Sequence, residues 1–217
     1  MNAIWTLDGD ETSWGSWADN IGLAPASHFI QELVVSAKTI HVGWALDVGC
    51  GTGRAFLPLT EAGYRVIGID PIMNSIRLCQ QRVSQVSIKA YPLLASATHI
   101  PLSDQTIGFV FAVNSLFHLS PAELTAAFLE IHRVLQPQGC ALLHFLALDD
   151  WRHKLAKEIP PEQAPLPGYR FVITCFCSEE KIREWIYRAG LTLIKIELKS
   201  IASEAGIQRN WLALCKK

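Results

Sequence analysis

The stretch ALDVGCGTGR, residues 45–54, decides the fold, because a short apolar run leads directly into three alternating glycines. A strand, a glycine-rich turn and a helix in this order open many nucleotide-binding units. The stretch lacks the lysine of a phosphate-binding GxxxxGK[ST] loop, and Arg54 stands where a dinucleotide fingerprint needs glycine or alanine. We therefore expect Gly49, Gly51 and Gly53 to bring the backbone close to a ligand that is not a pyrophosphate.

Two acidic residues refine this expectation. Asp47 precedes Gly49 by two residues and places a carboxylate beneath the turn, which would repel a pyrophosphate but suits a cofactor carrying an ammonium and a sulfonium. Asp70 closes YRVIGIDP, 21 residues after Gly49, near the offset of about 20 residues at which an acid meets ribose hydroxyls. The alternative for Asp70 is a cap on the helix that follows.

Strands and helices alternate along the whole chain. Hydrophobic spacing and breakers predict helices over 25–40, 54–62, 72–83, 121–135 and 178–189, and strands over 44–48, 64–69, 88–95, 109–113, 140–147, 191–198 and 210–215. Continuously apolar strands indicate a parallel sheet with both faces covered. The expected fold is α/β: a Rossmann-like, doubly wound, seven-stranded sheet, mostly parallel with an antiparallel last strand, and helices on both faces.

Composition narrows the classes of partner. The 217 residues are 50% apolar and 18% charged, with a net charge of −1 and no basic footprint for nucleic acid. No apolar run reaches the length of about 18 residues that spans a bilayer, and no basic leader precedes an apolar stretch. Six scattered cysteines suit reduced thiols. We expect a cytoplasmic protein with no nucleic-acid or membrane partner; the oligomeric state stays open.

Together these motifs resemble a class I S-adenosylmethionine-dependent methyltransferase of the methyltransferase 11 type, with a small-molecule acceptor. ALDVGCGTGR is similar to the first motif of that family and VIGIDP to the second. SATHIPLSDQTIGFVFAVNSLFHL resembles the third and fourth motifs, and IHRVLQPQGCALL the approach to strand five. SEEKIREWIYRAGLTLIKIE resembles the closing helix and sixth strand, so the likeness runs from about residue 45 to 215, apart from 150–175.

The resemblance implies S-adenosylmethionine as cofactor and S-adenosylhomocysteine as product. No metal ion is expected, because no CxxC or paired-His spacing supports zinc. The resemblance further implies that the methionine half lies among Asp47, Gly49, Gly51 and Gly53, the ribose on Asp70, the adenine against Pro71, Ile72, Ser96 and Ala97, and Asn114 beside the methionine moiety. Two positions depart from the family pattern, which commonly has Asp at the places of Ser96 and Gly108. A neutral acceptor bonds about half as strongly as a charged one, so we expect weaker cofactor affinity.

Candidate catalytic groups follow the fourth and fifth expected strands. His118, in NSLFHL, is a candidate general base for a hydroxyl acceptor, and a structural histidine is the alternative. His144 lies within a strand, where a core role is favoured. Asp149 and Asp150 with Asn114 resemble the oxygen ligands of catechol-type enzymes, although a solvated turn is the favoured interpretation.

The chain divides as one domain: an arm and helix (1–43), a cofactor-binding core (44–148), a possible acceptor flap (149–175), and a closing helix with two strands (176–217). Trp14 or Trp17, near Trp5 in the arm, either closes the pocket or packs the arm.

The expected reaction is in-line methyl transfer to a small molecule through oxygen, nitrogen or carbon. Nucleic-acid acceptors are disfavoured, because Asn114-Ser115-Leu116-Phe117 lacks the paired prolines of adenine enzymes and the chain has no Pro-Cys. The main alternative is a non-catalytic S-adenosylmethionine-binding or partner protein of the same fold. A nicotinamide-dependent oxidoreductase is a weaker alternative.

Overall fold

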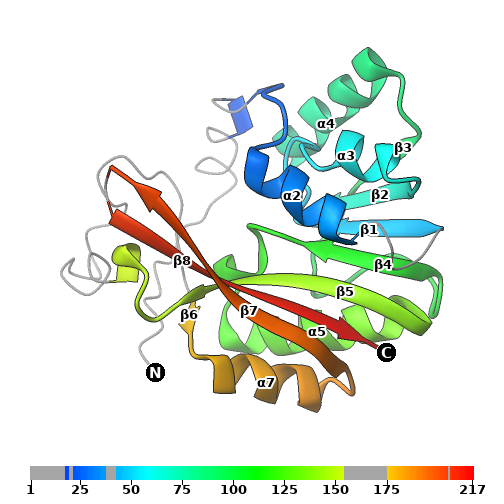
Figure 1. The fold of residues 1–217 in the computed structure, drawn as a ribbon. Helices are drawn as coiled ribbons and strands as arrows, with labels where there is room; N and C mark the ends of the chain where they lie inside the picture. Colours follow the sequence, from blue (N-terminus) through cyan, green and yellow to red (C-terminus); the bar gives the residue numbers. More distant parts are fainter. Residues whose placement is uncertain (1–17, 20–21, 38–42, 154–174, 205) are drawn as a thin grey trace.

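One mixed sheet lies between two layers of helices (Figure 1). The computed structural model describes residues 18–19, 22–37, 43–153, 175–204 and 206–217. The strands are β1 (Trp44–Val48), β2 (Arg65–Asp70), β3 (Ala90–Leu94), β4 (Ile107–Ala112), β5 (Leu135–Ala147), β6 (Phe176–Cys177), β7 (Thr192–Ser203) and β8 (Gly206–Lys216). The helices are α2 (His28–Ala37), α3 (Phe56–Glu61), α4 (Met73–Val86), the short 3₁₀ helix η1 (Leu116–His118), α5 (Pro121–Val134) and α7 (Glu179–Arg188).

The sheet order is β3-β2-β1-β4-β5-β8-β7. The pairs from β3 through to β5 are parallel, whereas β8 runs antiparallel to both β5 and β7. The predicted sheet is therefore confirmed, and β6 adds a short eighth strand. β6 pairs with Leu146 and Ala147 of β5, beyond the residues that pair with β4. Two residues are too few to produce a periodic signal, which is why the sequence did not indicate this strand.

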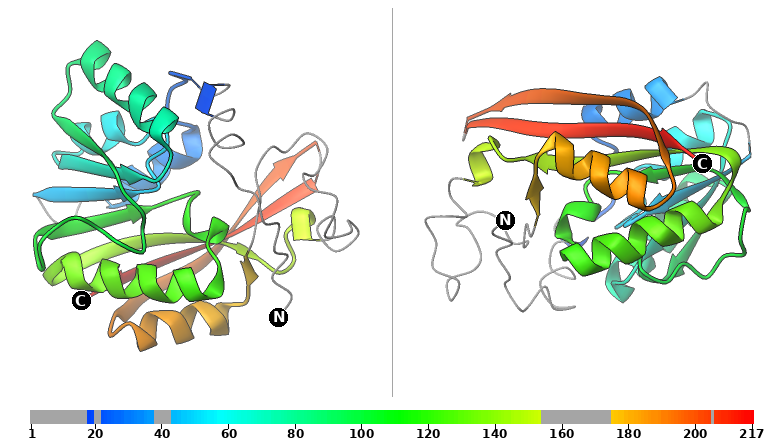
Figure 2. Two further views of the ribbon diagram at one scale, coloured as in Figure 1. Left: turned by 180° about the vertical axis from the view of Figure 1, so that it is seen from behind. Right: turned by 90° about the horizontal axis from the view of Figure 1, so that it is seen from below.

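Each face of the sheet is covered by its own helices, as the views in Figure 2 also show. On one face α2, α3 and α4 bury a cluster that includes Leu33, Phe56 and Cys79. On the other face α5 and α7 bury Phe128 and Trp185 against β4 and β5. Strands covered on both faces must be apolar throughout, and every residue of β4 is buried. None of the described helices is long and apolar enough to cross a membrane.

Serines set several helix starts. The Ser120 side chain accepts from the Glu123 amide, and the Glu123 carboxylate accepts from the Ser120 amide, which forms a complete capping box at α5. Ser178 accepts from the Lys181 amide at the start of α7, at the first residue of the helix predicted over 178–189. The helix predicted from Pro25 begins at His28, because the Ser27 side chain accepts from the Ile30 amide.

The sheet order reverses between β1 and β4. These two parallel strands are neighbours, but the chain continues from β1 to β2 on one side and from β4 to β5 on the other. A crevice therefore opens at their carboxyl ends. The glycine turn follows β1, and Asn114 lies two residues beyond the end of β4. The fold therefore brings together motifs that lie more than 60 residues apart in the sequence.

Candidate cofactor site

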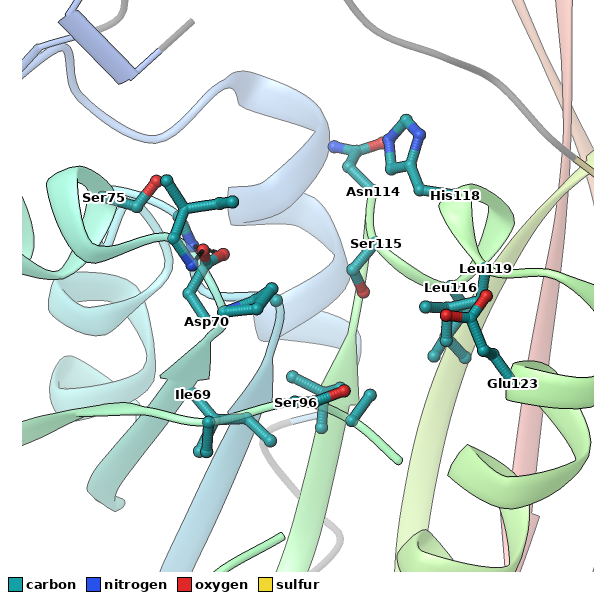
Figure 3. A pocket seen from close by; sticks show the side chains of 17 residues that line it. Ile69, Asp70, Ser75, Ser96, Asn114, Ser115, Leu116, His118, Leu119 and Glu123 are labelled. Carbon is teal, nitrogen blue, oxygen red and sulfur yellow. Dashed lines mark hydrogen bonds between the residues drawn. The ribbon is translucent and has the colours of Figure 1, made fainter. Parts of the chain in front are cut away.

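A cavity of about 370 Å³ occupies this crevice (Figure 3). Nine residues singled out from the sequence line it: Gly49, Gly51, Asp70, Pro71, Ile72, Ser96, Ala97, Asn114 and His118. In Figure 3, Asp70 and Ser75 lie on one side of the cavity, and Asn114 and His118 lie on the other. Asp47 and Gly53 are not among the residues that line the cavity.

The three glycines of the turn serve different purposes. All three have positive φ, at 71°, 53° and 75° for Gly49, Gly51 and Gly53. A Cβ on Gly49 would lie 2.3 Å from Cβ of Ser115, so this glycine lets the segment after β4 approach the turn. A Cβ on Gly53 would lie 2.5 Å from Sγ of Cys79, which places Gly53 against α4 rather than in the cavity.

The Asp70 carboxylate connects two backbone segments at the cavity. Its Oδ2 accepts from the Gly51 amide at 3.0 Å, and its Oδ1 accepts from the Ile72 amide at 2.9 Å. Burial raises the pKa of Asp70, while these two backbone hydrogen bonds act in the opposite direction. The carboxylate thus organises the turn and the start of α4, and it retains further lone pairs for a ligand.

Asp47 lies beneath the glycine turn with only 3% of its surface exposed. Burial, and secondarily the nearby Asp70 carboxylate, raise the pKa of Asp47 to about 8. A buried carboxyl group of this kind responds strongly to any positive charge brought to the turn.

Ser96 stands at the segment that follows β3. Its hydroxyl lies 2.9 Å from the Thr98 hydroxyl and accepts from the Thr98 amide at 3.2 Å. These local contacts stabilise the turn that ends at His99, whose amide donates to the Ser96 carbonyl. The Ser96 side chain is thus already engaged within its own turn.

Asn114 has a left-handed backbone, with φ of 59°. Its amide donates to Nδ1 of His144 at 3.2 Å. The next residue, Ser115, has a buried hydroxyl with no hydrogen-bond partner within the part of the chain that the structure describes. Because Ser115 lines the cavity, this hydroxyl is suited to bind a ligand.

His118 ends η1, with its ring centroid 4.4 Å from that of Phe117. Figure 3 shows its side chain beside that of Asn114 at the edge of the cavity. Sequence reasoning missed three further polar lining residues, Ser75, Ser115 and Glu123. Only the Ser120–Glu123 spacing carried a recognisable signal, that of a capping box.

The other candidates from the fourth and fifth strands lie away from the cavity. His144 is 1% exposed, in agreement with the core role that was favoured. Asp150 is fully buried and binds the Arg152 guanidinium at 2.7 and 2.8 Å, so the solvated turn expected for it is wrong. Its Oδ2 also accepts from the Arg209 amide. Asp149 is exposed and pairs with Arg209.

The described residues contain no cluster of three or more His, Cys, Asp or Glu side chains placed to hold a metal ion. Two sequence hypotheses lie outside the described residues: the roles of Trp5, Trp14 and Trp17, and most of the possible flap, at 154–174.

Comparison with known proteins shows similarity to methyltransferases. Residues 46–143 match the family model of a methyltransferase domain. A malonyl-[acyl-carrier protein] O-methyltransferase from Hamiltonella defensa is 31% identical over 117 residues, which cover 54% of this chain and 43% of that protein. The chain spans 36% to 43% of the length of the first curated relatives that it matches.

Solved structures agree in fold. A SAM-dependent methyltransferase from Methanosarcina mazei superposes with a TM-score of 0.73 at 20% identity, covering 85% of this chain and 96% of that one. The [4+2]-cyclase SpnF also superposes with a TM-score of 0.73, at 16% identity, covering 96% and 94% of the two chains. Residues 46–143 thus match the methyltransferase domain family, and the chain has the fold of a SAM-dependent methyltransferase.

Proposed function

We propose that the protein binds S-adenosylmethionine in the 370 Å³ cavity and transfers its methyl group to a small-molecule acceptor, leaving S-adenosylhomocysteine. The observation that carries this proposal is the convergence of four separated motifs on one cavity: the glycine turn, Asp70, the Ser96–Ala97 segment and Asn114. The match of residues 46–143 to the model of a methyltransferase domain supports the same activity.

The donor set suits the parts of this cofactor. Asp70 is an acceptor-only group for the two ribose hydroxyls, and Pro71 and Ile72 offer an apolar surface to adenine. The buried Ser115 hydroxyl lacks a partner among the described residues and can bond to a polar group of the ligand. The raised pKa of Asp47 suits a carboxyl group that ionises only when a cation approaches.

When bound, the cofactor supplies an electrophilic methyl group, so the protein mainly positions the reactants. We assign His118 as the general base for a hydroxyl acceptor, since it lies at the cavity edge beside Asn114. A small-molecule acceptor rather than nucleic acid is supported by the net charge of −1 and by the lack of paired prolines after Asn114. The six free cysteines support a location in the cytoplasm.

A second candidate is cofactor binding without methyl transfer. This candidate is supported by the [4+2]-cyclase SpnF, which has the same fold. The fold therefore also carries a function other than methyl transfer. The two candidates differ in a measurable way: only a methyltransferase moves the labelled methyl group from S-adenosylmethionine to another small molecule.

Calorimetric titration of the purified protein tests the proposal. We expect S-adenosylmethionine and S-adenosylhomocysteine to bind and NAD not to bind. Asp70→Asn should weaken S-adenosylhomocysteine binding by about 10- to 100-fold, because a hydrogen bond to a charged group contributes about 1.5–3 kcal/mol. Asp149→Asn, at an exposed carboxylate outside the cavity, is the matched control and should bind like the wild type.

Activity is then read by incubating the protein with methyl-labelled cofactor and a small-molecule extract. Label in a compound of the extract other than the cofactor supports methyl transfer. Cofactor binding without such a labelled compound supports the second candidate. If neither S-adenosylmethionine nor S-adenosylhomocysteine binds, both candidate functions are contradicted.

A further inference from the structure

His144 is a buried residue whose ring contacts residues from two neighbouring parts of the sheet. It lies on β5, and its ring connects Asn114, just beyond β4, to Asn210 on β8. The Asn114 amide donates to Nδ1 at 3.2 Å, and Nε2 lies 3.0 Å from Oδ1 of Asn210. The rings of Phe29 and Phe117 contact the imidazole edge-on, at centroid distances of 5.4 and 5.3 Å. Two hydrogen bonds and two ring contacts thus hold the imidazole in place.

These contacts determine the tautomer of the ring. A backbone amide can only donate a hydrogen bond, so Nδ1 of His144 must be the unprotonated nitrogen. The proton then resides on Nε2 and is donated to Oδ1 of Asn210. Burial lowers the pKa of His144 to about 4, so the ring is neutral under physiological conditions.

The accepted amide belongs to a residue whose backbone needs support. Asn114 is left-handed and lines the cavity, and the segment after it carries Ser115 and His118 to the same cavity. A left-handed residue other than glycine costs free energy and persists where its surroundings fix it. The hydrogen bond from Asn114 to the buried ring is such a constraint.

From this arrangement we infer that His144 is a positioning residue: its ring, held in one tautomer by Asn210, fixes the Asn114 backbone and thereby the wall of the cofactor cavity. The inference rests on the proposed function. His144 does not itself line the cavity and is 1% exposed, so it acts through Asn114 rather than on the cofactor or acceptor.

Two substitutions of similar shape isolate the acceptor. In His144→Asn the side-chain oxygen takes the place of Nδ1 and can still accept from Asn114, whereas His144→Leu removes the acceptor and leaves a comparable volume. Both variants lose the ring contacts with Phe29 and Phe117, so both should unfold more easily than the wild type. Only the leucine variant leaves the Asn114 amide without its acceptor.

The measurement is the Kd for S-adenosylhomocysteine together with the urea midpoint of each variant. We expect His144→Leu to bind about tenfold more weakly than His144→Asn, which corresponds to one hydrogen bond. Equal affinities of the two variants would overturn the inference, because a purely structural histidine would affect both alike.

Nitrogen-15 NMR of the wild type gives an independent readout. The imidazole shifts should identify Nδ1 as unprotonated and Nε2 as protonated, and the Asn114 amide signal should move more in His144→Leu than in His144→Asn. A protonated Nδ1 would overturn the inference whether or not the cofactor binds. Lack of binding by the wild type would instead contradict the proposed function, and the NMR signals would then decide the role of His144.

Discussion

At the scale of single residues, carboxyl groups are the most informative part of the cavity region. Asp70 is fixed by two backbone amides and can act as a rigid acceptor, whereas Asp47 lies deeper and has the pKa most sensitive to charge. The two groups therefore make different predictions, one about affinity and one about protons. The first is tested by Asp70→Asn as described above.

Asp47 predicts that cofactor binding releases a proton. Because burial raises its pKa to about 8, the group is protonated at neutral pH before a ligand arrives. A bound cation favours the ionised form and lowers the pKa, so a proton leaves and affinity rises with pH up to about 8. Titration of S-adenosylmethionine at neutral pH in two buffers of different ionisation enthalpy measures the release.

The expected result is a binding heat that differs between the two buffers in the wild type and not in Asp47→Asn. The same heat in both buffers for the wild type would contradict a proton-linked role for Asp47.

At the scale of elements, α4 links the cofactor turn to the segment before α2. Arg82 on α4 is 9% exposed, and its Nε donates to the Thr52 carbonyl at 2.7 Å. Its Nη2 donates to the Ala24 carbonyl at 2.7 Å and to the Gly22 carbonyl at 3.4 Å. One guanidinium therefore serves the turn after β1 and a segment nearly 30 residues upstream.

Arg82→Met should lower the free energy of unfolding by about 2–3 kcal/mol, because buried carbonyl groups lose their donor. Arg77→Met, on the exposed side of the same helix, should change it by less than about 0.5 kcal/mol. Urea unfolding of both variants measures the difference. Equal stability of the two would show that the Arg82 hydrogen bonds add nothing beyond what water supplies.

At the scale of the whole molecule, His144 links stability to pH. Its pKa of about 4 when folded lies below the unfolded value of 6.5, so the unfolded chain binds more protons between these values. Stability contributed by the neutral ring is complete above about pH 6.5 and is lost as the pH falls toward 4. The loss amounts to about 3 kcal/mol, since one pKa unit corresponds to about 1.4 kcal/mol.

Asp47 acts in the opposite sense, because its folded pKa is raised and the folded state keeps its proton as the pH rises. The measurement is therefore the stability of the wild type minus that of His144→Asn, in which the Asp47 contribution cancels. We expect this difference to shrink as the pH is lowered from neutral to about 4. A difference that does not change with pH would contradict the neutral, buried state of His144.

The order and type of the elements could be predicted because apolar runs, glycines and capping serines act over a few residues. The seven longer strands and the helix that begins after Ser178 followed from such local signals. The lining positions of Gly49, Asp70 and Asn114 agree with the predicted site at the strand ends, although their contacts with a ligand stay predictions.

The contacts that did not follow from the sequence connect distant residues. Gly53 packs against Cys79, and Asp150 binds the Arg209 amide across 59 residues. Ser96 lines the cavity as expected, but its hydroxyl is engaged by Thr98. Each of these depends on how complete elements pack, which no local pattern encodes.

The place of β8 in the sheet has a consequence for synthesis on the ribosome. β7 is made first, yet it touches β5 only through β8, so it has no partner strand until residues 206–216 have emerged. Asn210, which holds His144 in one tautomer, lies on that same strand. A nascent or truncated chain without β8 would leave this edge of β5 without its partner strand, and His144 would lack the Asn210 contact that sets its tautomer.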